Sequence, residues 1–272
     1  MTTVSESAID AAVERLMLAE RARKPVPPVR DILGADDIDG GYAVQSRIID
    51  HKISSGRRIT GRKIGLTAQA VQSQFGVFQP DFGVLLDDMV FGDRAEIPLD
   101  DFLQPRVEAE VAFVLGTDLP AGGTVVDVIR ATEFVLPAIE IVDSRIADWD
   151  IRITDTVADN ASSGAVVLGT RPMPLSEVDL AGAGMALEHR GEPISTGVGA
   201  ACLGSPVNAV AWLAGEVARR GAPLQAGEVI LAGAWGPMAP VDGPGSYLAQ
   251  FQDIGEVRVN FVTGHEEGGR RS

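Results

Sequence analysis

Two glutamates one residue apart interrupt an otherwise apolar run near the middle of this sequence. Glu108 and Glu110 lie within the segment 106–115. Apart from Arg106 and these two glutamates, all of its residues are apolar. Alternate side chains of a strand share a face, so the two carboxylates are expected to lie side by side. A strand that is apolar on both faces is normally covered on both, and adjacent carboxylates there repel each other and lose hydration. A hard divalent cation between them would relieve that repulsion.

A third carboxylate lies in a second apolar segment. Glu140 is the only charged residue between Glu133 and Asp143. A single glutamate in a strand more often faces water or pairs with an arginine, but three in apolar settings favour a bound metal. Since histidine and cysteine are absent from both segments, ligation by oxygen alone favours magnesium, manganese or calcium over zinc or copper. Three protein ligands would leave coordination positions open for water or substrate.

The composition is that of a soluble globular protein. The chain has 272 residues, of which 45% are hydrophobic and 22% charged, enough for one large domain or a domain with a helical extension. A net charge of −15 argues against binding to nucleic acid or to an anionic membrane surface. One cysteine, Cys202, permits no internal disulfide and is expected to be a packing residue. No apolar run is long enough to span a membrane, so we expect a cytoplasmic protein.

The pattern of apolar residues divides the chain into a helical and a β-rich part. Helical spacing runs through residues 5–55 with an interruption at 24–28, whereas short β-rich runs follow from Arg57 onward. One strong helix is expected after Ser205, with Gly221 at its end. We therefore expect an N-terminal helical portion over 1–56, a β-rich core over 57–263 and a flexible tail over 264–272.

Three polar segments near glycines are candidates for a site, although each alone is more often structural. Residues 61–67 are indicated as a glycine-bounded loop around Lys63, and this loop lacks the glycine spacing of a phosphate-binding loop. Residues 79–83 place Asp81 in a proline-initiated turn, where an aspartate usually bonds its own backbone. Residues 155–164 read as a long polar loop that caps a helix or lines a site.

Taken together, these segments resemble a known family. The sequences at 63–67, 79–83, 104–110, 143–149 and 155–162 are similar to those of the 2-keto-4-pentenoate hydratases, within the fumarylacetoacetate hydrolase-like superfamily. The resemblance keeps their order and runs from the N-terminal helices to about Val262. A series of motifs in order is far more specific than any one of them.

The resemblance implies a fold, a metal site and an assembly. The implied fold is α+β, with a mixed β-roll or barrel core like that of the fumarylacetoacetate hydrolase C-terminal domain and an N-terminal helical layer. It implies a homo-oligomer, a pentamer or a decamer. It also implies a divalent metal, Mg²⁺ or Mn²⁺, and assigns site residues in three roles. These are the metal ligands Glu108, Glu110 and Glu140, the catalytic pair Lys63 and Asp81, and Ser162 as a ligand of the substrate carboxylate.

The implied reaction adds water to 2-hydroxypenta-2,4-dienoate, or a substituted relative, to give a 4-hydroxy-2-oxo acid in the meta-cleavage degradation of aromatic compounds. Pathway partners of such an enzyme would be an aldolase or a decarboxylase. A metal suits a 2-oxo acid, which can chelate it through the carboxylate and the C2 oxygen. Proton transfer needs an acid and a base, here Lys63 and Asp81 in either order. A lysine near a cation and apolar walls is expected to have a lowered pKa.

Three alternatives remain beside the hydratase. The 4-oxalocrotonate (2-oxo-3-hexenedioate) decarboxylases share the metal glutamates and the Asp-Asn-Ala-Ser segment, but they lack the aspartate of the 79–83 turn, so Asp81 favours the hydratase. An acylpyruvate hydrolase would need a histidine or glutamate to activate water, and the histidines here match no such motif. A non-catalytic metal-binding scaffold would not need Lys63 and Asp81. The substituent on the dienoate and the choice between Mg²⁺ and Mn²⁺ are left open by the sequence.

Overall fold

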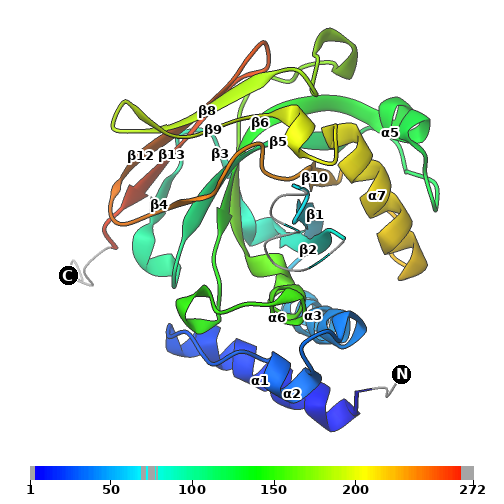
Figure 1. Cartoon of the computed structure of the whole chain (residues 1–272), viewed down its shortest axis with the longest axis vertical. Coiled ribbons are helices and arrows are strands. Elements are labelled where there is room, and N and C mark those ends of the chain that lie inside the picture. Colours follow the sequence, from blue (N-terminus) through cyan, green and yellow to red (C-terminus); the bar gives the residue numbers. More distant parts are fainter. Residues whose placement is uncertain (1–3, 69–71, 73–76, 78, 265–272) are drawn as a thin grey trace, which may run out of the picture.

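In a computed structural model of the chain, the described residues are 4–68, 72, 77 and 79–264. The first elements are the helices α1 (Glu6–Ala22), α2 (Arg30–Leu33) and α3 (Ile38–Ser54), which lie together at one end of the molecule with α6 (Ile153–Ala158) (Figure 1). Ser5 caps α1, since its side chain accepts a hydrogen bond from the amide of Ala8. The helical N-terminal part and its interruption after α1 agree with the sequence prediction.

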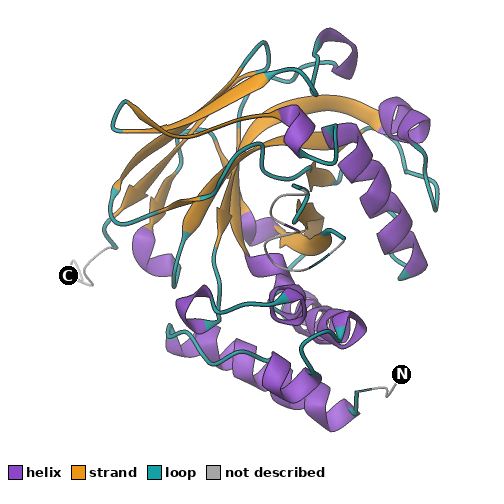
Figure 2. Cartoon of the chain, viewed as in Figure 1, coloured by secondary structure: helices purple, strands orange, loops and turns teal. Residues whose placement is uncertain are grey.

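Two β-sheets follow the helices (Figure 2). The larger sheet mixes parallel and antiparallel neighbours, because β1 pairs parallel with β10, and β3 parallel with β7. Its strands, in spatial order, are β2 (Asp81–Leu86), β1 (Ile59–Gly65), β10 (Val229–Leu231), β5 (Arg106–Leu115), β6 (Thr132–Val142), β7 (Ser163–Leu168) and β3 (Val90–Gly92), with β11 (Ala239–Pro240) paired to β5. The smaller sheet contains, in order, β4 (Glu96–Pro98), β13 (Gly255–Val262), β12 (Gly245–Phe251), β8 (Gly184–His189) and β9 (Glu192–Val198).

Two further helices, α5 (Val125–Ala131) and α7 (Pro206–Arg219), flank the larger sheet (Figure 1). Short 3₁₀ helices connect the other elements: η1 (Asp87–Met89), η2 (Leu99–Asp101), η3 (Ala147–Trp149), η4 (Asn160–Ser162), η5 (Leu175–Glu177) and η6 (Gly199–Ala201). Helix α7 lies where the sequence predicts it, and Gly221 follows it with a positive φ of 78°. Ser205 occupies its N-cap position, but its side chain makes no capping hydrogen bond. Every helix in the described ranges is too short or too polar to cross a bilayer.

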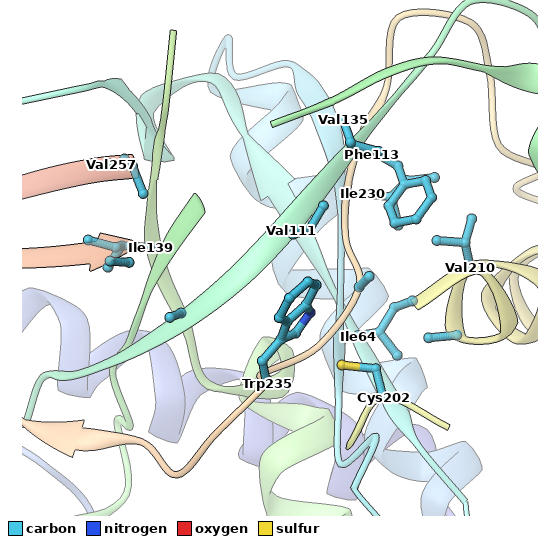
Figure 3. Close-up of a cluster of buried hydrophobic side chains, with 14 of the residues drawn as sticks. Ile64, Val111, Phe113, Val135, Ile139, Cys202, Val210, Ile230, Trp235 and Val257 are labelled. Carbon is cyan, nitrogen blue, oxygen red and sulfur yellow. The ribbon is translucent and has the colours of Figure 1, made fainter. Parts of the chain in front are cut away.

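The main hydrophobic core lies on one face of β5. Val107, Val111 and Phe113 point into it, and Figure 3 shows Phe113 gathered with Ile230 and with Val210 of α7. Cys202 is buried in the same core, as predicted for a packing residue. The opposite face of β5 carries Glu108 and Glu110. Further along that face, Ala112 and Val114 pack in a smaller hydrophobic cluster, so the two carboxylates occupy one end of the strand's second face.

Two segments that the sequence indicates as loops are regular structure. Residues 61–65 belong to strand β1, which runs close to β10; a Cβ on Gly61 would lie 1.9 Å from the carbonyl oxygen of Val229. The segment 155–164 contains helix α6 and the 3₁₀ helix η4 rather than a polar loop. Asp155 accounts for this difference, because its side chain accepts from the amides of Arg152 and Arg30 and so caps α6.

Buried polar contacts join the helical layer to the β-rich part. The guanidinium of Arg30 donates to the buried carboxylate of Asp155 at 2.7 Å. Gln45 of α3 donates to the carbonyl oxygens of Phe82 at 2.9 Å and Val157 at 3.0 Å. The division into a helical portion (1–56), a core (57–263) and a tail (264–272) stays a prediction, and the tail beyond Gly264 lies outside the described residues.

Candidate active site

Three carboxylates meet on one face of the larger sheet. The register of β5 and β6 places Glu108 directly opposite Glu140, and Glu110 opposite Ala138. One oxygen from each of the three glutamates lies within 4.8 Å of the others. Glu110 and Glu140 are fully buried, while Glu108 is half-buried. The three side chains that the sequence singles out therefore lie together, and their role as metal ligands stays a prediction.

The oxygens of this cluster are short of hydrogen-bond donors. The amide of Gly233 donates to Glu110 Oε2 at 2.8 Å. Glu110 Oε1 and both carboxylate oxygens of Glu140 have no hydrogen-bond partner among the described residues. Lys63 Nζ lies 3.0 Å from Glu140 Oε1, in ionic contact but outside hydrogen-bond geometry. Buried carboxylate oxygens are rarely left unpaired. The oxygens of this cluster are suitable ligands for a hard cation, and a bound cation would compensate their charge.

Burial and mutual repulsion shift the pKa values of the cluster. Burial, followed by the charge of Glu140, raises the pKa of Glu108 to about 7. The same two causes hold the pKa of Glu110 well above its ordinary value. Two of the three glutamates thus resist ionisation unless a positive charge compensates them.

Without a cation the pKa of Lys63 is raised, and the lowered pKa predicted for this lysine beside a bound cation stays a prediction. Burial lowers the pKa of this ammonium, but the carboxylates of Glu140 and Asp81, with the two other glutamates, outweigh burial and raise it. The prediction weighed the cation and the apolar walls without the number of acids around Nζ.

A cavity of about 650 Å³ opens beside the carboxylates, a volume suited to a small organic ligand. Lys63, Asp81, Glu108 and Ser162 all line it, although they come from β1, β2, β5 and η4. Its walls also include apolar and aromatic side chains, among them Ile64, Leu66, Val142, Trp149, Ile151, Trp235, Pro237 and Met238. The structure therefore brings every predicted site residue to one cavity or to the carboxylates beside it.

Asp81 begins β2 and is buried beside β1. Its Oδ2 accepts a hydrogen bond from Thr156 Oγ1 at 3.3 Å, and its Oδ1 has no partner among the described residues. A Cβ on Gly65, directly across the strand pair, would lie 2.2 Å from Asp81 Oδ1, so glycine is needed there to admit the carboxylate. Burial raises the pKa of Asp81 while the charge of Lys63 opposes that rise.

Ser162 ends a strained turn. Asn160, Ala161 and Ser162 have φ values of 54°, 52° and 53°, in the left-handed region that side chains other than glycine rarely adopt. Asn160 holds this turn, since its side chain accepts from the amide of Val84 at 2.7 Å and donates to the carbonyl of Val84 at 2.9 Å. The Oγ of Ser162 is buried without a hydrogen-bond partner in the described part of the chain. Strain of this kind, maintained by specific contacts, is typical of functional sites.

Several residues of the site were not assigned a role by sequence reasoning. Thr156, Arg106 and Trp149 lie inside the motifs that carry the family resemblance, but alternation and spacing could not show that their side chains reach the cavity. Gly233, whose amide binds Glu110, lies in the segment after β10 that was not singled out. The glycines and the tryptophan in the sequence Gly-Ala-Trp-Gly at 233–236 are the signal that could have indicated this segment as part of the site.

The comparisons with known proteins agree with this geometry. Residues 60–263 match the family model described as fumarylacetoacetate (FAA) hydrolase C-terminal. The chain belongs to this family. Its fold class is therefore the one expected: an α+β, FAA hydrolase-like core with mixed sheets, preceded by helices.

Similar members of the FAA hydrolase family cover nearly the whole chain. A protein of Pseudomonas putida named TodF product hydratase is 52% identical over 263 residues, which are 96% of this chain and 98% of that protein. A 2-keto-4-pentenoate hydratase of Paraburkholderia xenovorans is 50% identical over 260 residues, 95% of this chain and 97% of its own. Among solved structures, 4-oxalocrotonate decarboxylase from Pseudomonas putida G7, complexed with magnesium and adipate, superposes with a TM-score of 0.91 at 33% identity, covering 96% of this chain and all of the other.

Proposed function

We propose that this chain is a metal-dependent hydratase that adds water to 2-hydroxypenta-2,4-dienoate, or a substituted analogue, in the meta-cleavage degradation of aromatic compounds. The product is a 4-hydroxy-2-oxo acid. The observation that carries the proposal is the convergence of Glu108, Glu110 and Glu140 beside a cavity that also holds Lys63 and Asp81. Relatives about half identical over nearly the full chain are named as hydratases of this kind, which supports the assignment.

Glu108, Glu110 and Glu140 would hold the metal. Their unpaired, buried oxygens fit a hard divalent ion, and the solved decarboxylase relative carries magnesium in one structure and calcium in another. Mg²⁺ or Mn²⁺ is proposed here. When bound, such an ion would anchor a 2-oxo acid and stabilise negative charge that develops on its C2 oxygen.

Lys63 and Asp81 would move the protons. The reaction requires a proton delivered to carbon and a proton taken from the attacking water, so a donor and an acceptor must both face the substrate. Asp81 Oδ1 lacks a donor among the described residues and is free to accept the proton of water. The Lys63 ammonium, held beside Glu140, would be the donor. Ser162 Oγ, also unpaired, would donate to the substrate carboxylate.

The runner-up is a 4-oxalocrotonate decarboxylase. It is favoured by the close superposition on the solved decarboxylase from Pseudomonas putida G7. The 33% identity to that enzyme is lower than the 50% and 52% identity to proteins named as hydratases. Asp81 also favours the hydratase, since a decarboxylation needs no group to activate an attacking water.

A direct assay separates these activities. Freshly generated 2-hydroxypenta-2,4-dienoate is mixed with metal-free enzyme, with and without Mg²⁺ or Mn²⁺, and loss of the dienol absorbance is followed before products are identified. Metal-dependent formation of 4-hydroxy-2-oxopentanoate is the expected result. Carbon dioxide released from 2-oxohex-3-enedioate, with no reaction of the dienoate, would move the assignment to the decarboxylase.

Metal binding is expected to stabilise the protein more strongly at pH 8 than at pH 6. Because burial and the charge of Glu140 raise the pKa of Glu108 from its ordinary value of 4.5 to about 7, the folded state binds more protons in that interval. The stability of the metal-free protein therefore falls as the pH rises from about 4.5 to about 7, and a cation reverses that loss. With Mn²⁺ at about 100 times its Kd, a rise in Tm of roughly 5 to 10 °C is expected at pH 8.

The measurement is thermal unfolding at both pH values with and without Mn²⁺. Glu140→Gln serves as the control, because it removes a ligand and should show little rise at either pH. A rise of equal size at pH 6 and pH 8 in the natural protein would contradict the link to carboxylate ionisation.

Gly233→Ala is expected to weaken metal binding about 10- to 100-fold by displacing the amide that orients Glu110. Gly233 has a φ of 102°, and a Cβ there would lie 2.2 Å from Thr67 Oγ1. Its carbonyl oxygen also accepts from Cys202 Sγ at 3.0 Å, so the peptide is held from both sides. The readout is the Kd of Mn²⁺ by titration calorimetry.

Gly227→Ala is the matched control for this variant. Gly227 also has a positive φ, 84°, but nothing lies within 4 Å of a Cβ there. Both substitutions should cost about 1 to 3 kcal/mol of stability through backbone strain. Equal Mn²⁺ affinity in the two variants would show that the Gly233 amide does not position the ligand.

The proposal also covers the location of the enzyme in the cell, its assembly and the limits of its domains. We place the enzyme in the cytoplasm as a homo-oligomer, a pentamer or decamer, beside an aldolase or decarboxylase of the same pathway. The family resemblance and the single, buried cysteine support this proposal. Light scattering coupled to gel filtration would measure the assembly, and limited proteolysis would test the boundary near residue 56.

A further inference from the structure

We propose that Arg106 binds the substrate carboxylate together with Ser162, so that the two residues form a carboxylate subsite one strand step from the metal ligands. This inference rests on the proposed function, because it assigns a residue to the substrate of that reaction. It names a guanidinium that neither the metal ligation nor the proton transfers use. It also specifies which end of the substrate the cation recognises.

The register of three neighbouring strands places this subsite. Arg106 pairs with Val142 of β6, and Val142 pairs with Ser163 of β7, next to Ser162. Glu108 and Glu140 form the neighbouring pair on the same face, two residues along each strand. A carboxylate lying over Val142 would therefore have Ser162 on one side and Arg106 on the other. Its attached C2 oxygen would face the three glutamates.

Arg106 is a cation without an acidic partner in the described part of the chain. Its guanidinium stacks over the ring of Trp149, with Cζ 4.4 Å from the ring centroid, and Nη1 lies 3.8 Å from Met238 Sδ. All three side chains line the cavity. Lys63, the other cation of the lining, is already in contact with Glu140. Arg106 is therefore the positive group left for an anionic ligand in a chain whose net charge is −15.

The platform under Arg106 is held rigidly. Asp148 and Trp149 have left-handed φ values of 59° and 53°, an arrangement that costs free energy unless contacts maintain it. Gln104 supplies them: its Oε1 accepts from the amide of Asp148 at 2.9 Å, and its carbonyl oxygen accepts from Trp149 Nε1 at 3.1 Å. Its Nε2 donates to the carbonyl oxygens of Ser144 and Ile146. A planar guanidinium fixed on an indole is preorganised to bind a carboxylate through two parallel hydrogen bonds.

The rest of the wall suits an uncharged end of the substrate. Beyond Arg106 and the catalytic groups, Leu66, Ile151, Trp235 and Pro237 present apolar surface to the cavity. A second carboxylate at the far end of the ligand would lose hydration against these groups without a cation to compensate it. Among the described residues of the lining, the place suited to a carboxylate is therefore the one beside the proposed metal ligands.

The test measures binding without turnover. Mn²⁺-loaded protein is titrated with 2-oxopentanoate, which has the carboxylate and the C2 oxygen but no alkene, and with pentane-2,3-dione, which has two adjacent oxygens and no carboxylate. Arg106→Gln is expected to weaken 2-oxopentanoate about 10- to 100-fold, the range for a hydrogen bond to a charged group, and to leave the dione unchanged. The Kd of Mn²⁺ alone should change far less than that of 2-oxopentanoate, because the charge of Arg106 is the weakest of those that act on Glu108.

Two further variants complete the design. Arg171→Gln removes an exposed arginine outside the cavity and should change none of these constants. Arg106→Lys keeps the charge but loses the planar guanidinium, so a smaller loss of affinity for 2-oxopentanoate is expected. If Arg106→Gln is not folded at the temperature of the titration, Arg106→Lys is used in its place.

Three results would overturn the inference. The first is an unchanged affinity for 2-oxopentanoate, and the second is equal losses for 2-oxopentanoate and the dione. The third uses the dicarboxylate 2-oxohexanedioate as an additional ligand: a loss confined to it would place Arg106 at the far end of the ligand. Because these titrations need no product, they remain decisive even if the dienoate assay finds another reaction. Conversely, the hydratase can be established by its product while Arg106 proves to have no part in binding.

Discussion

Glu140→Gln is expected to lower kcat severely and to remove most of the metal affinity while leaving the fold intact. Glutamine keeps the shape of the side chain but loses the charge that a hard cation requires. Loss of the metal removes several kcal/mol of transition-state stabilisation, on the order of a 1,000-fold fall in kcat. Since Glu140 Oε1 and Oε2 have no hydrogen-bond donor among the described residues, the substitution breaks no structural hydrogen bond.

The measurements are the Kd of Mn²⁺ and the rate of dienol loss at saturating metal. Glu108→Gln should behave in the same way, because it faces Glu140 across the strand pair. Glu133→Gln, an exposed residue of the same strand as Glu140, is the matched control and should retain both binding and activity. Full activity in Glu140→Gln would refute the proposed metal site.

Asp81→Asn is expected to lower kcat about 100- to 10,000-fold with no loss of metal affinity. An amide cannot take a proton from water, yet asparagine fits the space that Gly65 leaves and can still accept the hydrogen bond of Thr156. Lys63→Met should lower kcat similarly. Its metal affinity should rise, because the ammonium no longer competes for Glu140. Measuring both kcat and the Kd of Mn²⁺ for each variant therefore distinguishes proton-transfer residues from metal ligands.

Thr156→Val is the companion experiment for Asp81. It removes the hydroxyl that donates to Asp81 Oδ2 without altering charge, so a smaller fall in kcat is expected with the Mn²⁺ affinity unchanged. If Asp81→Asn instead retained its kcat and lost metal, the carboxylate would have to be counted among the ligands and the acid and base sought elsewhere.

The proposed metal ligands could be predicted from sequence because their signal is local. Alternation along one strand places Glu108 beside Glu110, and the cost of burying charge makes their apolar neighbours informative. The same reasoning applied to Glu140. It could not show that Glu108 and Glu140 are paired across β5 and β6, since strand register depends on contacts between segments distant in the chain.

The roles of Lys63, Asp81 and Ser162 came from the family resemblance rather than from local pattern. Residues 61–65 read as a loop because their glycines are turn formers, whereas in the structure Gly61 and Gly65 are needed where β1 passes close to Val229 and Asp81. Burial and pairing with neighbouring strands outweighed the local preference. A single sequence contains the glycines but not the neighbours that require them.

By itself, the sequence determined the acidic cluster, the helical beginning, the β-rich remainder and the family. Only the tertiary structure decided that Arg106 lies on Trp149, that Ser162 ends a strained turn, and that an amide at Gly233 orients Glu110. The physical reason is the range of the interactions. Periodicity and burial cost act within a few residues, whereas the cavity is assembled from strands and turns whose contacts form only when the whole chain is folded.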